Sequence, residues 1–124
     1  MNRFKESFVK NRLRSLKYAY KGLYKLIQTE NSIKLQIAAA VAITIIGFVM
    51  RITSTEWIIQ ILSIGLVLAV EGLNTAIEKI ADFIHPEHHD KIGEIKDIAA
   101  GAVSFSALAA LGIALVIYVP KFIT

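Results

Sequence analysis

Four polar side chains that could take part in catalysis recur at helical spacing in VLAVEGLNTAIEKIAD, residues 67–82: Glu71, Asn74, Glu78 and Asp82. At about 100° per residue, the last three return to within about 60° of Glu71, so all four form one stripe on a helix. Glu71 and Glu78 are separated by a rise of about 10.5 Å, which is too far for one metal ion to bridge them directly. The stripe therefore predicts two roles: a deeper, partly desolvated carboxylate that takes a proton, and an outer one that holds a hard cation.

Three further charged residues could complete such a site. Glu30 stands where a basic segment meets the first apolar segment, and Lys96 and Asp97 stand where the third apolar segment begins. Magnesium commonly binds through a few carboxylates together with nucleotide phosphates, and a lysine at the same level could balance phosphate charge. Taken singly, each of the three is more simply explained as an ordinary interfacial or helix-end charge.

Several common site types are absent from the sequence. Neither GxxxxGK[ST] nor GxGxxG occurs, so any nucleotide site would be unconventional. The chain has no cysteine, which excludes disulfides and cysteine-ligated metals. The histidines of HPEHH, namely His85, His88 and His89, could suggest zinc, but a single short loop without acids at HExxH spacing favours a solvated loop.

Three apolar segments, at about 33–50, 57–84 and 97–120, approach the roughly 20 residues that a helix needs to cross a bilayer. They predict an all-α membrane protein with three transmembrane helices in one domain, residues 1–124. For the second segment an alternative stays open, because its purely apolar part ends near Val70. On that alternative, the polar stripe would lie on a water-exposed extension of the helix.

Residues 1–30 are predicted to form an amphipathic helix on an anionic membrane surface. Eight of the fourteen lysines and arginines fall between Arg3 and Lys25, against one acid, Glu6. A soluble basic helix packed on its own domain is the alternative, and the apolar periodicity argues against a nucleic-acid partner. Basic segments stay on the cytoplasmic side, so we expect a multi-pass protein of the cell membrane with a cytoplasmic N-terminus. The apolar residues at three- and four-residue steps are Phe4, Phe8, Leu13, Leu16, Tyr20, Leu23 and Ile27.

The run EGLNTAIEKIADFIHPEHHDKIGEIKDIAAGAV, residues 71–103, resembles the core of the small bacterial membrane lipid kinases, the diacylglycerol kinase and undecaprenol kinase family. The hallmark of that family is E-x-x-N-S/T-A-I-E-x-x-x-D, followed after a loop by K-D-x-A/G-x-A-A/G-V. Upstream, YAYKGL at residues 18–23 and the acid Glu30 also look like the family. The hallmark positions matched are Glu71, Asn74, Thr75, Ala76, Ile77, Glu78, Asp82, Lys96, Asp97 and Val103.

The resemblance implies a homotrimer that transfers the γ-phosphate of ATP to a lipid hydroxyl and requires Mg²⁺. By motif position, Glu71 resembles the general base, Asn74 the residue that orients the base and the hydroxyl, and Glu30 and Glu78 the magnesium ligands. The nucleotide-site residues implied in the same way are Tyr18, Glu30, Glu78, Glu87, His88, His89, Lys96 and Asp97.

The favoured acceptor is undecaprenol, giving undecaprenyl phosphate, and diacylglycerol is the alternative acceptor. Ester oxygens buried without donors would cost about 1–3 kcal/mol each, and the second and third apolar segments offer few uncharged polar side chains away from the stripe. The loop sequence also resembles the undecaprenol kinases of Gram-positive bacteria. From other classes, a small oligomeric proton or ion transporter and a structural membrane protein stay open. The candidate polar side chains are Gln60, Ser63, Ser104 and Ser106.

Overall fold

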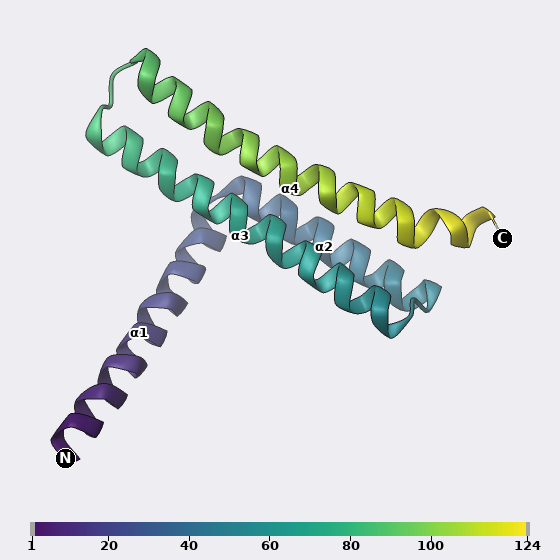
Figure 1. Cartoon of the computed structure of the whole chain (residues 1–124), viewed down its shortest axis with the longest axis horizontal. Coiled ribbons are helices and arrows are strands. Elements are labelled where there is room, and N and C mark those ends of the chain that lie inside the picture. Colours follow the sequence, from purple (N-terminus) through teal and green to yellow (C-terminus); the bar gives the residue numbers. More distant parts are fainter. Residues whose placement is uncertain (1, 124) are drawn as a thin grey trace. The chain divides into compact units, whose positions relative to one another are not determined.

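The computed structural model describes residues 2–123, which form four helices joined by short turns. The predicted all-helical fold is confirmed, and three of these helices are long and apolar enough to cross a membrane. The chain divides into two compact units, residues 1–34 and residues 35–124. In chain order, the helices are α1 (Asn2–Thr29), α2 (Asn31–Met50), α3 (Ser54–Ile84) and α4 (Asp90–Ile123) (Figure 1).

The first unit consists of α1 and the first residues of α2. Its apolar side chains Phe8, Leu13 and Leu16 are all more than half exposed within the chain. Helical hydrogen bonding continues past the end of α1, because the Glu30 N–H donates to the Leu26 carbonyl and the Lys34 N–H donates to the Glu30 carbonyl, each at 3.2 Å. Contact of α1 with a membrane surface, and assembly as a homotrimer, stay predictions.

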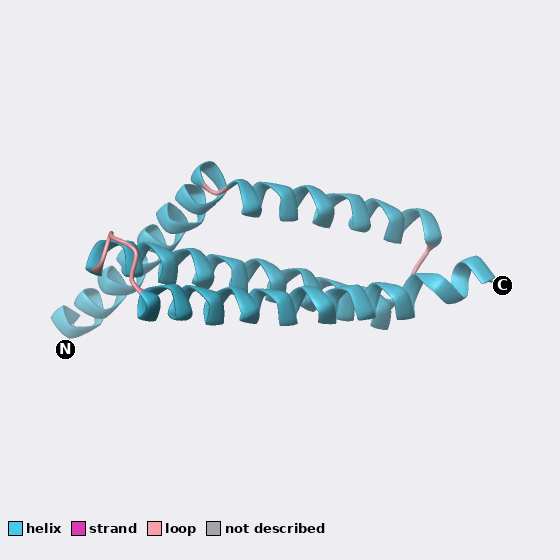
Figure 2. Cartoon of the chain, turned by 90° about the horizontal axis from the view of Figure 1, so that it is seen from above, coloured by secondary structure: helices cyan, strands magenta, loops and turns pink. Residues whose placement is uncertain are grey.

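The second unit contains the rest of α2 together with α3 and α4, and each of these helices runs antiparallel to the one before it (Figures 1 and 2). Residues 51–53 join α2 to α3, and residues 85–89 join α3 to α4. We call the end of this unit that carries residues 51–53 the turn end, and the end that carries residues 85–89 the histidine-loop end. Short connections hold neighbouring helices antiparallel.

The turn after α2 stops that helix without a glycine. Arg51 has a φ of 53°, the left-handed conformation that commonly ends helices. The Arg51 N–H donates to the Phe48 carbonyl at 3.3 Å and the Ile52 N–H to the Gly47 carbonyl at 3.2 Å, which is the Schellman pattern. Ile52 is buried by this turn. The turn therefore fixes where α3 begins.

A capping box starts α3. The Thr53 hydroxyl accepts a hydrogen bond from the Glu56 N–H at 3.2 Å, and the Glu56 carboxylate accepts from the Thr53 N–H at 2.9 Å. Close by, α2 approaches α3 at Gly47, where an added Cβ would lie 2.8 Å from Cη2 of Trp57. The missing side chain at Gly47 makes room for the indole ring, which packs on Phe48 with ring centroids 4.7 Å apart.

Four polar side chains, here called the turn-end network, join the three helices: Glu56, Gln60, Tyr118 and Lys121. The Tyr118 hydroxyl donates to Gln60 Oε1 at 2.6 Å, and Gln60 Nε2 donates to the Ile43 carbonyl of α2 at 3.4 Å. Lys121 Nζ lies 3.1 Å from both carboxylate oxygens of Glu56. Tyr118 also belongs to a buried cluster with Ile52 and Ile117. The network ties the C-terminal turns of α4 to the start of α3.

Large apolar side chains cover the outward faces of this unit. Phe83 is 90% exposed within the chain and Phe105 79%. In water such faces would be a serious aggregation liability, whereas lipid or neighbouring subunits would cover them without cost. The exposure therefore agrees with the membrane spans that length and composition indicate.

Candidate active site

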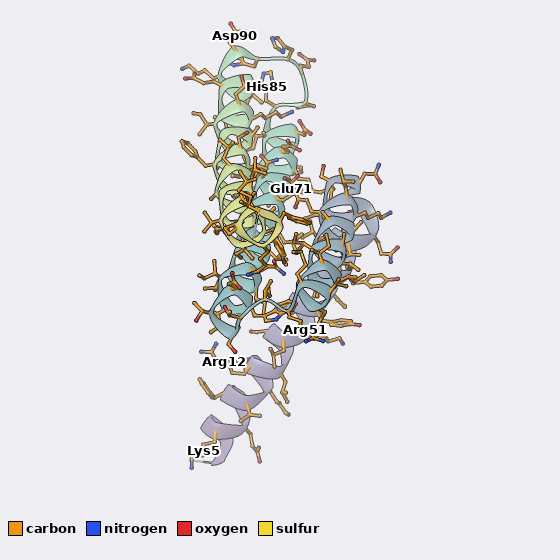
Figure 3. The ribbon with its side chains drawn as sticks, turned by 90° about the vertical axis from the view of Figure 1, so that its right-hand side faces the viewer. Lys5, Arg12, Arg51, Glu71, His85 and Asp90 are labelled. Atoms are coloured by element: carbon orange, nitrogen blue, oxygen red, sulfur yellow. The ribbon has the colours of Figure 1, made fainter. Side chains whose placement is uncertain are left out.

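Glu71 is a buried carboxylate on α3 that points toward α2 (Figure 3). Only 8% of its surface is exposed within the chain. Its Oε2 accepts a hydrogen bond from Nε2 of Gln36 on α2, with a donor–acceptor distance of 3.3 Å. A charged group at this depth is costly and normally faces a bundle interior or a functional site. Glu71 therefore faces the interior of the helix bundle.

Asn74 and Glu78 form the second pair on the stripe, one turn further toward the histidine-loop end. Asn74 Nδ2 donates to Glu78 Oε1 at 3.4 Å, while Asn74 Oδ1 is buried and has no hydrogen-bond partner among residues 2–123. Asn74 is 8% exposed, whereas Glu78 is an exposed residue. The side-chain contact of Asn74 is therefore with Glu78 rather than with Glu71.

Burial along the stripe falls from Glu71 toward the histidine-loop end. Glu71 is buried in the helix bundle, while Glu78 and Asp82 are exposed. The two carboxylates therefore stand in different environments, one inside the bundle and one that water can reach. The chemical roles of Glu71 and Glu78 stay predictions.

Lys96 on α4 pairs with Asp82 at the outer end of the stripe. Its Nζ lies 2.5 Å from Asp82 Oδ1, and the side chains of Lys96 and Asp82 are 36% and 60% exposed. Asp97, the next residue, is exposed on α4. In this state, Lys96 neutralises the outermost carboxylate of the stripe, and a polyanionic ligand would compete with Asp82 for its ammonium group.

The histidine loop presents a solvated polar surface. His85 Nδ1 lies 2.8 Å from the Glu87 carbonyl, and His89 Nδ1 accepts from the Lys91 N–H at 3.1 Å. The rings of His85 and His89 meet edge to face, and His88 Nε2 lies 3.6 Å from a carboxylate oxygen of Asp90. The loop is therefore shaped by its own hydrogen bonds, as expected for the solvated-loop interpretation.

Two predicted site residues, Tyr18 and Glu30, belong to the first unit. Tyr18 is exposed on α1, with the ammonium group of Lys21 5.9 Å from its ring centre. Glu30 is half-buried between α1 and α2. Their roles at the site stay predictions.

The carboxylates match magnesium in donor type but do not form a complete cage. Within residues 2–123 there is no group of three His, Cys, Asp or Glu side chains close enough to hold a metal ion. Magnesium nevertheless needs only one or two carboxylates when nucleotide phosphates supply the other ligands. Glu78 offers hard oxygen donors that water and phosphate can reach. The fit is therefore to a metal shared with a phosphate ligand.

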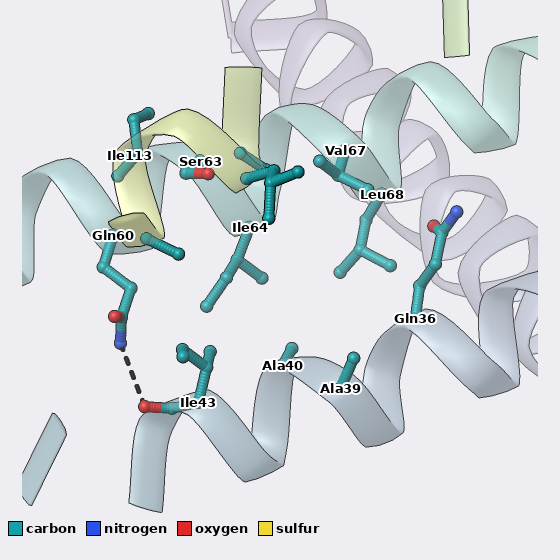
Figure 4. A pocket seen from close by; sticks show the side chains of 13 residues that line it. Gln36, Ala39, Ala40, Ile43, Gln60, Ser63, Ile64, Val67, Leu68 and Ile113 are labelled. Atoms are coloured by element: carbon teal, nitrogen blue, oxygen red, sulfur yellow. Dashed lines mark hydrogen bonds between the residues drawn. The ribbon is translucent and has the colours of Figure 1, made fainter. Parts of the chain in front are cut away.

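Sequence reasoning missed Gln36, whose side chain reaches the buried carboxylate. Gln36 also lines a cavity of about 260 Å³ between α2, α3 and α4, with Gln60 lining it further toward the turn end (Figure 4). The only signal in the sequence is a glutamine inside the apolar run of the first predicted span. That signal gives no partner, because the pair joins residues 35 positions apart.

A family model described as prokaryotic diacylglycerol kinase matches residues 17–118. Undecaprenol kinase of Bacillus subtilis is 39% identical over 121 residues, covering 98% of this chain and 92% of that protein. Diacylglycerol kinase of Haemophilus influenzae is 32% identical over 110 residues, covering 89% of this chain and 92% of that protein. Diacylglycerol kinase of Escherichia coli K12 is 30% identical over 94 residues, covering 76% of this chain and 77% of that protein.

Proposed function

The chain belongs to the prokaryotic diacylglycerol kinase family and is a membrane lipid kinase, and on that premise we propose that it phosphorylates undecaprenol with ATP. The observation that carries this choice of acceptor is the 39% identity to an undecaprenol kinase over 98% of the chain. Diacylglycerol is the second candidate, favoured by the 32% identity to a diacylglycerol kinase over 89% of the chain.

The proposed reaction begins at the lipid hydroxyl. Its oxygen attacks the γ-phosphorus of ATP, the bond between that phosphorus and the bridging oxygen of ADP breaks, and Glu71 takes the hydroxyl proton. The products are a lipid phosphate and ADP, and Glu71 then returns the proton to water. The burial of Glu71 supports this role, because a buried carboxylate with a single amide donor is poorly solvated and is held in one place. Catalysis then comes mainly from positioning and charge stabilisation.

On the nucleotide side, we propose that Glu30 and Glu78 hold Mg²⁺ together with phosphate oxygens. When bound, Mg²⁺ neutralises part of the phosphate charge. Asn74 supports the role of Glu78, because its amide N–H fixes one carboxylate oxygen. We also propose that Asn74 orients the acceptor with its unpaired oxygen. The remaining proposed nucleotide contacts are Tyr18, Glu87, His88, His89, Lys96 and Asp97.

The choice of undecaprenol over diacylglycerol gains support from the polar side chains of α3 and α4. Diacylglycerol carries ester oxygens that need donors, whereas undecaprenol carries a hydroxyl on a hydrocarbon chain. Three of the four candidate side chains are engaged: the hydroxyls of Ser104 and Ser106 donate to carbonyls of their own helix, and Gln60 donates to the Ile43 carbonyl. Donors already engaged in this way are poor partners for an ester. A bias of roughly tenfold or more toward the ester-free alcohol is expected for each ester oxygen left without a donor.

We propose that the enzyme works as a homotrimer in the cell membrane, with its N-terminus in the cytoplasm. This orientation puts the histidine loop and the outer part of the stripe on the side where ATP is available. The excess of basic residues before α2 supports it. The exposed apolar faces of α3 and α4 are the surfaces that neighbouring subunits and lipid would cover.

The test is a phosphorylation assay with purified protein in matched mixed micelles. The protein receives magnesium and γ-labelled ATP with undecaprenol or with diacylglycerol, and the labelled lipids are separated. We expect a higher kcat/KM for undecaprenol, with measurable turnover of diacylglycerol. Diacylglycerol as the better acceptor would replace the proposed substrate, and no labelled lipid with either alcohol would favour the transporter alternative.

The Glu71→Gln variant tests the base directly, because it keeps the size of the side chain but cannot take the proton. We expect kcat to fall by about 100-fold or more while nucleotide binding is retained. The matched control is Glu94→Gln, which removes an exposed carboxylate on α4 and should turn over at the wild-type rate. Full activity in Glu71→Gln would assign the base to another residue.

A further inference from the structure

Gln36 is the closest described polar partner of the proposed base, although it lies outside the family hallmark. It is part of α2, and its Nε2 reaches across to Glu71 Oε2 on α3 at 3.3 Å. This distance is at the long end for an N–H donor. Catalytic hydrogen bonds are often long before substrates bind and shorten in the reacting complex. The contact thus has the form expected of a side chain that aims the base.

The other half of the Gln36 amide has no partner. Oε1 is buried and accepts no hydrogen bond from residues 2–123. Figure 4 shows the amide oxygen on the cavity side of the side chain and the nitrogen on the other. Turning the amide over would bring its oxygen against the Glu71 carboxylate, so the contact with Glu71 determines this orientation. Leaving a buried acceptor unpaired is unfavourable, and the pairing with Glu71 is what the amide gains in return.

The cavity offers a comparison within the same chain. Gln60 lines it toward the turn end, but both halves of that amide are paired, Oε1 with the Tyr118 hydroxyl and Nε2 with the Ile43 carbonyl. Gln60 therefore has the contacts of a residue that stabilises the fold. Gln36 has one contact, to a proposed catalytic group, and one unpaired atom.

We infer that Gln36 is a positioning residue for phosphoryl transfer: its amide N–H holds the Glu71 carboxylate in the orientation that receives the proton of the acceptor hydroxyl. The inference rests on the proposed role of Glu71. Gln36 acts through Glu71 and leaves nucleotide binding unaffected. Its effect on the rate therefore exists only while residue 71 can take a proton.

The experiment compares Gln36→Met and Gln60→Met in the full-length protein, each alone and combined with Glu71→Gln. Methionine keeps the length of the side chain and removes the amide. We expect Gln36→Met to lower kcat by about tenfold to a hundredfold, the effect of losing one hydrogen bond to a charged group, with the KM for magnesium ATP unchanged. In the Glu71→Gln background, the same substitution should leave the residual kcat unchanged, because the group that it aims is already lost.

Gln60→Met is expected to show the opposite pattern, with a lower midpoint of unfolding and an unchanged kcat per folded enzyme. Gln36→Met should leave the midpoint of unfolding near that of wild type, because two effects oppose each other. Removing the unpaired amide oxygen stabilises the fold, whereas losing the hydrogen bond to Glu71 destabilises it. Unchanged kcat in Gln36→Met overturns the inference, as does an equal slowing in both backgrounds. If the wild-type enzyme phosphorylates only diacylglycerol, the kcat of each variant relative to wild type is measured with that lipid. In that case undecaprenol is rejected as the acceptor, and the role of Gln36 is still tested. If wild type phosphorylates neither lipid, the proposed function and this inference both fail.

Discussion

Replacing Tyr118 with phenylalanine tests how strongly the turn-end network holds the helices together. The substitution deletes one hydroxyl, which donates to Gln60 Oε1 at 2.6 Å and lies 3.4 Å from the Ile43 carbonyl. Tyr118 is 7% exposed and Gln60 4%, so water cannot easily replace the lost donor. Leaving a buried acceptor without a partner costs about 1–3 kcal/mol in soluble proteins. Hydrogen bonds between membrane helices are worth less, about 0.6 kcal/mol on average and at most about 1.7.

We therefore expect Tyr118→Phe to lower the free energy of unfolding by about 1–1.7 kcal/mol, nearer the upper limit for membrane helices because the 2.6 Å contact is short and buried. The measurement is reversible unfolding in mixed micelles, monitored by helical circular dichroism. Gln60→Leu combined with Tyr118→Phe should cost less than the sum of the two single variants, since the partners are then both apolar. Turnover per folded enzyme should stay unchanged, because Gln60 lies about 16 Å of helix rise from Glu71. A Tyr118→Phe protein as stable as wild type would refute the reasoning.

Two further predictions concern the metal and the helix contact at the turn end. Glu78→Gln should raise the magnesium concentration needed for half-maximal activity, because a charged oxygen ligand is lost, and excess magnesium should partly restore the activity. The Glu94→Gln control should show the magnesium dependence of wild type. Full activity of Glu78→Gln at low magnesium would exclude Glu78 as a ligand. Gly47→Ala should lower the unfolding midpoint, because the new methyl group would meet the Trp57 ring at 2.8 Å. Overpacking of this kind costs about 1–3 kcal/mol, which outweighs the gain of up to roughly 1 kcal/mol in helix propensity. Gly65→Ala is its control, because the added methyl group has no neighbour within 4 Å apart from the adjacent residues and the nearby backbone of its own helix. Equal midpoints for the two variants would contradict the clash.

The helices were predictable because hydropathy and periodicity report on lipid burial, but their ends were less so. α4 begins at Asp90, well before the predicted start near residue 97, and continues past Pro120 to Ile123. Hydropathy locates the part of a helix that suits hydrocarbon, and a helix can extend beyond that part into water. α3 likewise continues without a break through Val70, so the polar stripe is part of a single 31-residue helix. The bounds of a membrane span and the bounds of its helix are separate quantities.

The stripe was predictable for a different reason, since residues on one helix are related by fixed angles. Angular arithmetic put Glu71, Asn74 and Glu78 on one face, and the structure pairs the last two. The arithmetic gives no information about the facing helix, so it missed Gln36, which meets Glu71 only through the packing of α2 on α3. It also could not foresee that Lys96 of α4 would pair with the outermost carboxylate of the stripe.

The two ends of the second unit follow different physical rules, and the difference explains how the fold can hold a carboxylate inside a membrane helix. At the turn end, the capping box, the Lys121–Glu56 pair and the Tyr118–Gln60 contact leave few polar groups without partners. At the stripe, two buried amide oxygens lack donors within residues 2–123, one beside Glu71 and one beside Glu78. Unpaired buried acceptors destabilise a fold, so they persist only where the rest of the structure is stable enough to hold them. The well-satisfied turn end supplies that stability. Substitutions at the turn end should therefore change stability first, and substitutions at the stripe should change turnover first.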